Sequence, residues 1–481
     1  MTMLIGGEML LWSDLDGSHG RAPVSGAALR SLLSPPFGRT LVAGPHAPEL
    51  LEALPPAQVT VLVRGAADAE ILAARGLTVV CGSLEKLAAV PAYDTVIALD
   101  GLDRLHSAEA EPHSWTETLG LLLAVLKPAG RLLLGVENLF GVHRLAALPV
   151  TPTDADWTVP DDHDPQRPAG HARLRTHLTG SGLHVQRDYA AYPGLSSPTV
   201  LLSQEIQADA ALAGALEAAV ATAVQPTTDV LTDPVRLATA AVRNGLATEL
   251  APAWVVIAHR APGTPPDAAG PDAVINGRQF RLPAADLPRG RTLEDHLLAA
   301  AQRRDLPTMR DLLTTWQASP SAGVPAAQTV VGDNGDLTAL APAADPLTAL
   351  RTFAASAIAG GFAHLWPIRA DEAELTAVLA GMTGRELEPS EVPPADKPGA
   401  HAVGDLLADR DRLTRELSEA KAKHEWYEQM LLRREAELKR VRQMNALLSA
   451  TVPGKAATTL VGGLRAGKRA VRSVVRRTRG S

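Results

Sequence analysis

Short, almost wholly apolar runs alternate with helical segments between residues 38 and 140, and this alternation restricts the chain to one class of fold. The apolar runs are Thr40–Ala43, Val59–Val63, Leu77–Cys81, Thr95–Leu99 and Arg131–Val136. Strands that are nearly all apolar are buried on both faces, so the sheet is expected to be parallel and covered by helices. The pattern predicts a doubly wound α/β domain with right-handed crossovers.

The same pattern continues to about residue 205. Two late strands are expected at His184–Tyr189 and Thr199–Ser203, and a helical extension that follows them leads to a further strand at Trp254–His259. We therefore place a mostly parallel, seven-stranded, Rossmann-like domain with a helical extension at residues 38–260. Residues 1–37 form a separate N-terminal segment.

A smaller α+β domain is predicted at residues 271–384. It opens with a hairpin that turns at Asn276-Gly277, and a second hairpin turns within residues 332–336. Helical patterns fill the rest of this domain. A linker rich in proline follows at residues 385–404.

Residues 405–450 are predicted to form a coiled coil of about six heptads, because the apolar positions are spaced alternately by three and four residues. Nine of the thirteen seam positions are apolar. The seam positions are Leu406, Arg410, Leu413, Leu417, Ala420, His424, Tyr427, Leu431, Arg434, Leu438, Val441, Asn445 and Leu448. We expect a homo-oligomer through this helix; the alternative is an amphipathic helix that packs on its own protein.

The last segment, residues 453–481, carries eight basic residues and no acidic one, whereas the other 452 residues have a formal charge of −15. Such a tail is expected to bind an anionic partner. A membrane surface fits better than nucleic acid, because the tail has no aromatic residue for base stacking. A solvated tail without a partner is the alternative.

The composition indicates a cytoplasmic protein, peripheral at the membrane if the tail binds there. No apolar stretch approaches the ~20 residues of a membrane span, and the N-terminus lacks the basic leader of a signal peptide. The single cysteine, Cys81, excludes a disulfide framework.

Two sequence signals resemble the class I S-adenosylmethionine-dependent methyltransferases over roughly residues 38–205. The first is the strand Tyr93–Asp100, and the second is Lys127-Pro128-Ala129-Gly130 before the next strand. The late strands also fit, since that family adds an antiparallel last strand to its sheet. The stretch Val136-Glu137-Asn138 is further similar to a bacterial subgroup linked to cell-surface polysaccharides.

The resemblance implies an S-adenosylmethionine site at the carboxyl ends of the strands. Its expected contacts are Gly44, His46, Arg64, Gly82, Ser83 and Asp100. Gly44 would permit close backbone approach, and Ser83 and Asp100 would contact adenosine. Arg64 departs from the family pattern, because an acid normally accepts the ribose hydroxyls there and a guanidinium cannot accept a hydrogen bond. Asp68 is the nearest acid that could replace it.

The acceptor side is expected at Glu137 and Asn138, with His163 as general base. His163 lies in a polar cluster at residues 161–171, whose spacing fits no standard metal-ligand set, and a solvated loop is the alternative interpretation. The implied activity is methyl transfer to a small molecule, a saccharide or a cell-envelope precursor.

Two other functions remain open at this point. One is a catalytically inactive methyltransferase-like scaffold that oligomerises through its coiled coil. The other is a protein that binds another nucleotide or a sugar phosphate in the same crevice, which Arg64 would suit.

Overall fold

A computed structural model shows how these segments are arranged. It describes residues 2–33, 38–147, 164–224, 230–262, 270–362, 365–366, 371–392 and 403–450. Contacts divide the chain into one unit at residues 1–405 and a second at residues 406–481. His163, residues 393–402 of the proline-rich linker and the basic tail lie outside the described residues.

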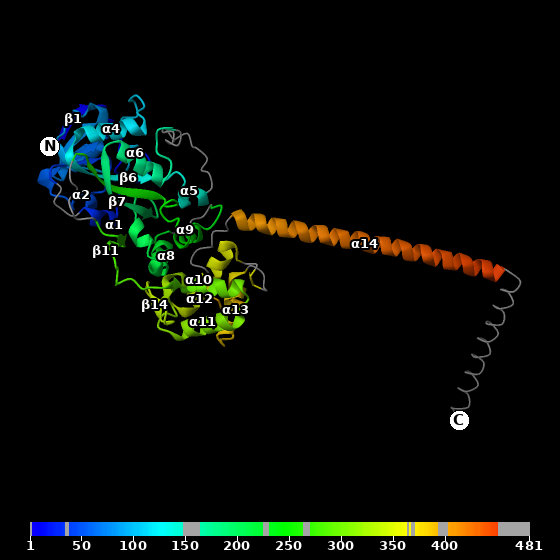
Figure 1. Cartoon of the computed structure of the whole chain (residues 1–481). Coiled ribbons are helices and arrows are strands. Elements are labelled where there is room, and N and C mark those ends of the chain that lie inside the picture. The colour runs from blue at the N-terminus through cyan, green and yellow to red at the C-terminus, as the bar shows by residue number, and fades with distance from the viewer. Residues whose placement is uncertain are drawn as a thin grey trace. The chain divides into compact units, whose positions relative to one another are not determined.

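The first unit is built on a large mixed sheet with eleven strands among the described residues (Figure 1). Its spatial order is β1-β4-β3-β2-β5-β6-β9-β7-β8-β10-β11. The strands are β1 (Thr2–Gly6), β2 (Thr40–Ala43), β3 (Val59–Val63), β4 (Thr78–Gly82), β5 (Tyr93–Ala98), β6 (Leu126–Glu137), β7 (Leu183–Tyr192), β8 (Val200–Ser203), β9 (Ala253–Arg260), β10 (Ala273–Ile275) and β11 (Arg278–Phe280).

The predicted α/β class is confirmed by the pairing of these strands. From β1 through β6 all neighbours are parallel. Strand β9 lies between β6 and β7 and is antiparallel to both, whereas the resemblance is based on the late pair of strands that correspond to β7 and β8. The sheet is wider than predicted at both edges, because β1 adds to β4 and the β10–β11 hairpin pairs with β8. That hairpin was expected to open the accessory domain.

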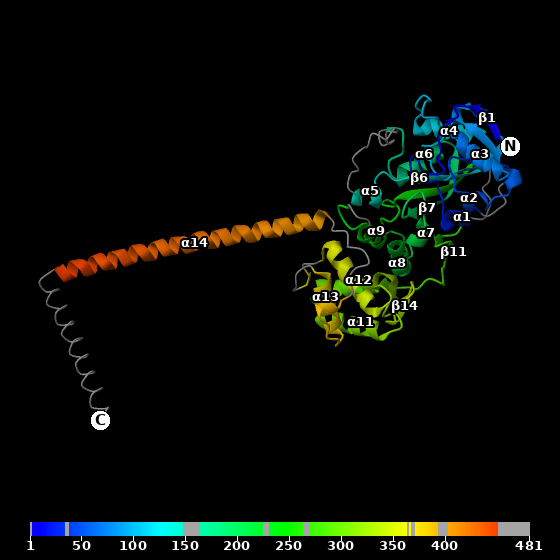
Figure 2. The same cartoon turned by 180° about the vertical axis from the view of Figure 1, so that it is seen from behind.

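Alternate side chains of the central strands enter two separate cores, so both faces of the sheet are buried. Leu41 of β2 packs in the core that contains Leu119 and Leu174, whereas Val42 packs in the core that contains Leu50 and Leu72. Helices α4 and α6 thus cover one face, and α2 and α3 cover the other (Figure 2).

Helices α2, α4, α7 and α9 of the α/β part begin at a side-chain cap or a proline. In α4, Ser114 and Glu117 form a capping box, in which each side chain binds the backbone N–H of the other residue. The helices are α1 (Ala27–Leu32), α2 (Pro48–Leu51), α3 (Ala66–Ala74), α4 (Trp115–Val125), α5 (Val142–Ala146), α6 (His171–Gly180), α7 (Gln204–Gln207), α8 (Ala213–Ala223) and α9 (Pro234–Arg243).

A small antiparallel sheet and four helices follow in the same unit and form a third core around Trp316 and Phe353. The strands are β12 (Arg291–Thr292), β13 (Thr329–Val331) and β14 (Leu337–Ala339), and the helices are α10 (Leu293–Gln302), α11 (Leu306–Ala318), α12 (Pro346–Ala357) and α13 (Glu372–Met382). Residues Val403–Ala450 form one continuous helix, α14. In the described part of the chain no helix has the length and apolarity needed to cross a membrane.

Candidate functional site

Residues 7–25, here called the N-terminal strap, follow β1 and cross the carboxyl ends of the parallel strands. Three of the backbone hydrogen bonds that fix the strap run from Met9 N to Arg64 O (2.8 Å), from Val24 N to Pro45 O (3.2 Å) and from Ser25 N to Ser196 O (2.7 Å). In open α/β sheets ligands bind outside these strand ends. The strap therefore lies where the sequence predicted the cofactor.

Glycines at the strand ends let the backbone of the N-terminal segment approach closely. A Cβ atom on Gly65 would lie 2.5 Å from the carbonyl oxygen of Trp12, and one on Gly82 would lie 2.5 Å from that of Gly6. Gly44 has a φ of +89°, and its Cβ position is 3.3 Å from the Leu105 side chain. The close approach that the resemblance assigned to a ligand is made here by the chain itself.

Arg64 is bound along one edge of its guanidinium by both carboxylate oxygens of Asp14 in the strap. Arg64 Nε lies 2.8 Å from Asp14 Oδ2, and Nη2 lies 2.9 Å from Oδ1. Both side chains are buried, and Arg64 also donates to the carbonyl of His106. Burial opposes ionisation of Asp14, but the hydrogen bonds and charge of Arg64 outweigh it and lower the pKa of Asp14 below its usual value.

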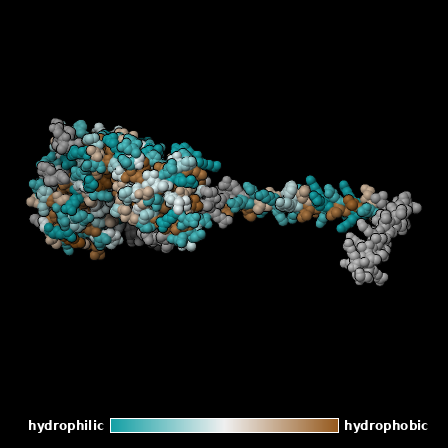
Figure 3. Space-filling model, turned by 90° about the horizontal axis from the view of Figure 1, so that it is seen from below, coloured by the Kyte–Doolittle hydropathy of each residue, from teal (hydrophilic) through white to brown (hydrophobic). Residues whose placement is uncertain are grey.

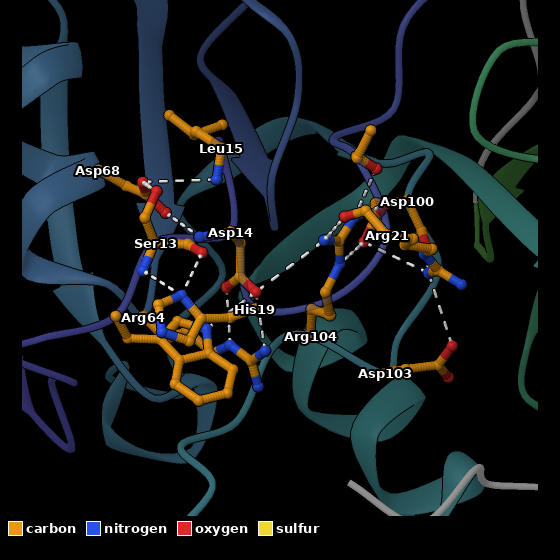
Figure 4. Close-up of polar contacts among 12 residues, drawn as sticks. Ser13, Asp14, Leu15, His19, Arg21, Arg64, Asp68, Asp100, Asp103 and Arg104 are labelled. Carbon is orange, nitrogen blue, oxygen red and sulfur yellow. Dashed lines mark hydrogen bonds and ion pairs between the residues drawn. The ribbon is translucent and has the colours of Figure 1, made fainter. Parts of the chain in front are cut away.

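Asp100, at the end of β5, is held in the same way by Arg104. Arg104 donates from Nε to Asp100 Oδ2 at 2.8 Å and from Nη2 to Oδ1 at 2.6 Å. It also donates to the backbone carbonyls of Arg21 and Ala22 in the strap. Arg21 in turn donates to the backbone carbonyl of Asp100. Figure 4 shows how the ion pairs of Arg64 and Arg104 meet on Asp14 and the strap.

Asp68, the acid expected to replace the missing ribose acceptor, binds the strap as well. Its carboxylate accepts hydrogen bonds from the Ser13 hydroxyl at 2.5 Å, from Asp14 N at 2.8 Å and from Leu15 N at 3.4 Å (Figure 4). The side chain is fully buried, and burial raises the pKa of its carboxyl group. Asp68 thus accepts the hydrogen bonds of the polar groups at Ser13, Asp14 and Leu15 in the strap.

Ser83 and His46 have structural partners too. Ser83 donates to Glu85 and accepts from Ser107 N. His46 Nε2 accepts from the Leu99 N–H at 3.2 Å, while Nδ1 lies 3.0 Å from the Gly44 carbonyl. The ring is buried and burial lowers the pKa of His46, so it is neutral and fixes the loop after β2.

The residues expected on the acceptor side do not come together as a catalytic group among the described residues. Both amide donors of Asn138 are used by the carbonyls of Glu249 and Ala251, each at 2.8 Å. Glu137 contacts His143 at 3.1 Å and Arg144 at 3.2 Å. Its other oxygen lies 3.8 Å from Arg21, which joins Glu137 to the strap.

We expect the ion pairs of Glu137 to stabilise the fold in a pH-dependent way. Burial would raise the pKa of Glu137, but His143, Arg144 and Arg21 together lower it to about 2. Because the folded-state pKa is depressed, this stability is present above about pH 4.5 and is lost as the pH falls toward 2. Glu137→Gln should lower the free energy of unfolding by about 2 kcal/mol at pH 7 and by much less near pH 3. Urea unfolding of both proteins at each pH measures this.

Substitution of the exposed Glu111 by glutamine is the matched control, with little expected effect at either pH. A Glu137→Gln deficit that stays constant between pH 7 and pH 3 would mean that its charge is not what stabilises the fold.

The residues present do not fit S-adenosylmethionine at the strand ends. The polar side chains predicted to hold it at the ends of β3, β4 and β5, Arg64, Ser83 and Asp100, are all engaged within the chain. A cleft of about 940 Å³ lies beside the strap, between residues 7–12 and 107–113, and its lining includes four glutamates. Among the described residues, no group of three or more His, Cys, Asp or Glu side chains is placed to hold a metal ion.

The sequence analysis missed the residues that close the crevice, namely Asp14, Arg21 and Arg104. One signal could have pointed to them: a buried strand that ends in an arginine requires a carboxylate nearby, because an unpaired buried charge is costly. Residues 1–37 contain three such candidates, Glu8, Asp14 and Asp16.

Comparisons with known proteins give only distant likenesses to solved structures. No protein-family model matches the sequence, and no curated protein matches it. Solved structures that resemble the chain include an S-adenosylmethionine-dependent methyltransferase from Archaeoglobus fulgidus (13% identity, 46% of this chain and 86% of that one, TM-score 0.27). A second is an S-adenosylmethionine-dependent methyltransferase from Mesorhizobium loti (13% identity, 48% and 96%, TM-score 0.26). At these values the likeness does not extend to ligand or activity.

Proposed function

We propose that this chain is a methyltransferase-like protein that binds no S-adenosylmethionine, and that its α/β unit serves as a non-catalytic interaction module in an oligomeric assembly. The observation that carries this proposal is the buried Asp14–Arg64 ion pair at the end of β3. In this pair the Arg64 guanidinium occupies the position where a cofactor site would need a free carboxylate to accept the ribose hydroxyls. The strap that supplies Asp14 covers the remaining strand ends.

The energetics of the strap support a permanently closed crevice. A ligand at the strand ends would have to displace the strap, which would leave Arg64 buried without the carboxylate of Asp14. Arg104 would keep its ion pair with Asp100 but lose the carbonyls of Arg21 and Ala22. Breaking one buried ion pair in this way costs about 3–5 kcal/mol. Since each 1.4 kcal/mol is a factor of ten, the apparent affinity would fall by roughly a hundredfold to a few thousandfold.

Isothermal titration of the full chain with S-adenosylmethionine and S-adenosylhomocysteine tests the proposal. We expect no heat and no change in melting temperature up to about 1 mM ligand, the concentration that corresponds to about −4 kcal/mol of binding. Asp14→Asn, which weakens the strap, should also give no heat, because Arg64 remains unsuited to ribose.

Two results would overturn the proposal. Heat with the unmodified chain that disappears in Gly44→Leu would establish a cofactor site and return methyl transfer, with its small-molecule or saccharide acceptor, as the function. Heat in Asp14→Asn alone would mean that the strap covers a competent site and regulates access to it.

A further inference from the structure

Helix α14 presents an apolar stripe to solvent along its described length. Among the side chains described between residues 413 and 447, none is buried. Figure 3 shows hydrophobic side chains recurring between hydrophilic ones along this helix. The exposed apolar side chains on the seam, each more than half exposed, are Leu413, Leu417, Tyr427, Leu431, Leu438 and Val441. An isolated helix gains no stability from an exposed apolar stripe, whereas a second helix packed along the same seam would bury these side chains.

We propose that α14 pairs with α14 of a second copy of this chain as a parallel, in-register, two-stranded coiled coil. The alternating spacing of three and four places Leu417, Leu431 and Leu438 at the a positions of the heptad, and Leu413, Tyr427 and Val441 at the d positions. This inference does not depend on whether the α/β unit binds a cofactor.

The charges beside the seam select a partner identical to this helix. In a parallel coiled coil, the g residue of one helix lies near the e residue five positions later in its partner. Applied to α14, this rule pairs Glu416 with Lys421, Lys423 with Glu428 and Glu437 with Arg442, each across the two copies. All three pairs are attractive, and each forms twice in a symmetric dimer.

The same charges argue against the opposite orientation. In an antiparallel pair the g residues face one another. With nearly full overlap, Glu416 of one copy would then lie beside Glu437 of the other. The antiparallel arrangement thus loses the attractive contacts of Glu416 and Glu437 and places these two carboxylates beside each other instead.

A polar seam position further favours two parallel strands. Asn445 lies at an a position, where asparagine specifies register and a two-stranded state at some cost in stability. His424, also at an a position, lies 3.4 Å from Glu428 on its own helix.

Disulfide trapping in the full chain tests orientation and register together. Val441→Cys places a thiol at a d position, which meets the equivalent thiol of the second copy only when the helices are parallel and in register. The native Cys81 is fully buried and does not compete. We expect a covalent dimer in Val441→Cys under mild oxidation, and little in the control Arg440→Cys, whose c position faces outward. Equal trapping at both positions, or none at position 441, would overturn the proposed geometry.

Sedimentation of charge variants tests the choice of partner. Glu416→Lys turns two attractive pairs of the dimer into repulsive ones, so its dissociation constant should rise about tenfold. The swap Glu416→Lys/Lys421→Glu should restore the original value. Unchanged melting of the α/β unit shows that the variants are folded. A native chain that stays monomeric at about 100 µM, well above the dissociation constant of a weak dimer of about 1 µM, would refute the proposal.

Discussion

Replacement of Asp14 by asparagine is expected to lower the free energy of unfolding by about 3–5 kcal/mol. Asparagine keeps the shape of the side chain but removes its charge, and it turns an amide NH₂ toward a guanidinium. Arg64, which is 6% exposed, then keeps its charge in the protein interior without a carboxylate. Arg104, whose Nη1 lies 3.9 Å from Asp14, loses part of its compensation as well. Urea unfolding at pH 7 measures the loss.

The matched control is Asp16→Asn, two residues along the same strap. Asp16 is exposed and binds only its neighbours within the turn, so its effect should stay within about 0.5 kcal/mol. A loss below about 1 kcal/mol in Asp14→Asn would mean that water screens the pair, as in exposed salt bridges. The strap would then be held by backbone contacts alone.

A double variant distinguishes the interaction between Asp14 and Arg64 from the interactions of each residue with the rest of the protein. Asp14→Leu/Arg64→Met removes both charges, and buried ion pairs replaced by apolar residues of similar size are often neutral or stabilising. We therefore expect the double variant to recover most of the stability that either single change loses. The difference from additivity measures the coupling between the two side chains.

The parallel part of the sheet could be predicted from sequence because its signal is local. Each central strand is an uninterrupted apolar run, and β2 and β3 occupy the predicted residues Thr40–Ala43 and Val59–Val63. The widening of the sheet could not be predicted in this way. Strand β1 shows two exposed apolar side chains, Met3 and Leu4, and its position at the edge depends on pairing with β4, more than seventy residues away.

The location of the candidate site residues followed from the fold, but their partners did not. Arg64 and Asp100 do follow parallel strands at the same edge of the sheet, as the sequence analysis predicted. What they bind is decided by Asp14 and Arg104, and the Asp14–Arg64 contact joins residues fifty positions apart. The spacing of apolar residues along the sequence gives no indication of such a long-range contact. A motif at a strand end therefore predicts which side chains meet, and leaves open whether a ligand or the chain itself satisfies them.

At the strand ends, the kinds of contact that bind ligands in other proteins bind the strap instead. A glycine gives the strap backbone room, arginine and aspartate bind bidentately, and a buried carboxylate accepts backbone N–H groups. These contacts are mutually dependent, because the glycine sets the position of Trp12 and hence that of Asp14. A change in the glycine should then weaken the ion pair without touching either charge.

Gly65→Ala tests this dependence, and we expect it to lower the free energy of unfolding by about 3 kcal/mol. Gly65 precedes α3 with φ −83° and ψ 128°, a conformation that alanine adopts without strain, so the cost comes from contact alone. The new methyl group would lie 2.5 Å from Trp12 O and 3.1 Å from Asp68 Oδ2. Overpacking typically costs about 1–3 kcal/mol, and displacement of the strap from Arg64 brings the effect to the upper end.

Gly120→Ala provides a control of opposite sign, because Gly120 is exposed in α4 with no atom within 4 Å of its Cβ position. Alanine there should stabilise the helix by about 0.5–1 kcal/mol. Trypsin gives a second measurement, since a displaced strap should be cut faster at Arg21 in Gly65→Ala than in Gly120→Ala. If Gly65→Ala is as stable as the native chain and is cut no faster, the strap does not press on the end of β3. The Asp14–Arg64 ion pair would then hold the strap without help from the glycine, and the proposed dependence between the two would be wrong.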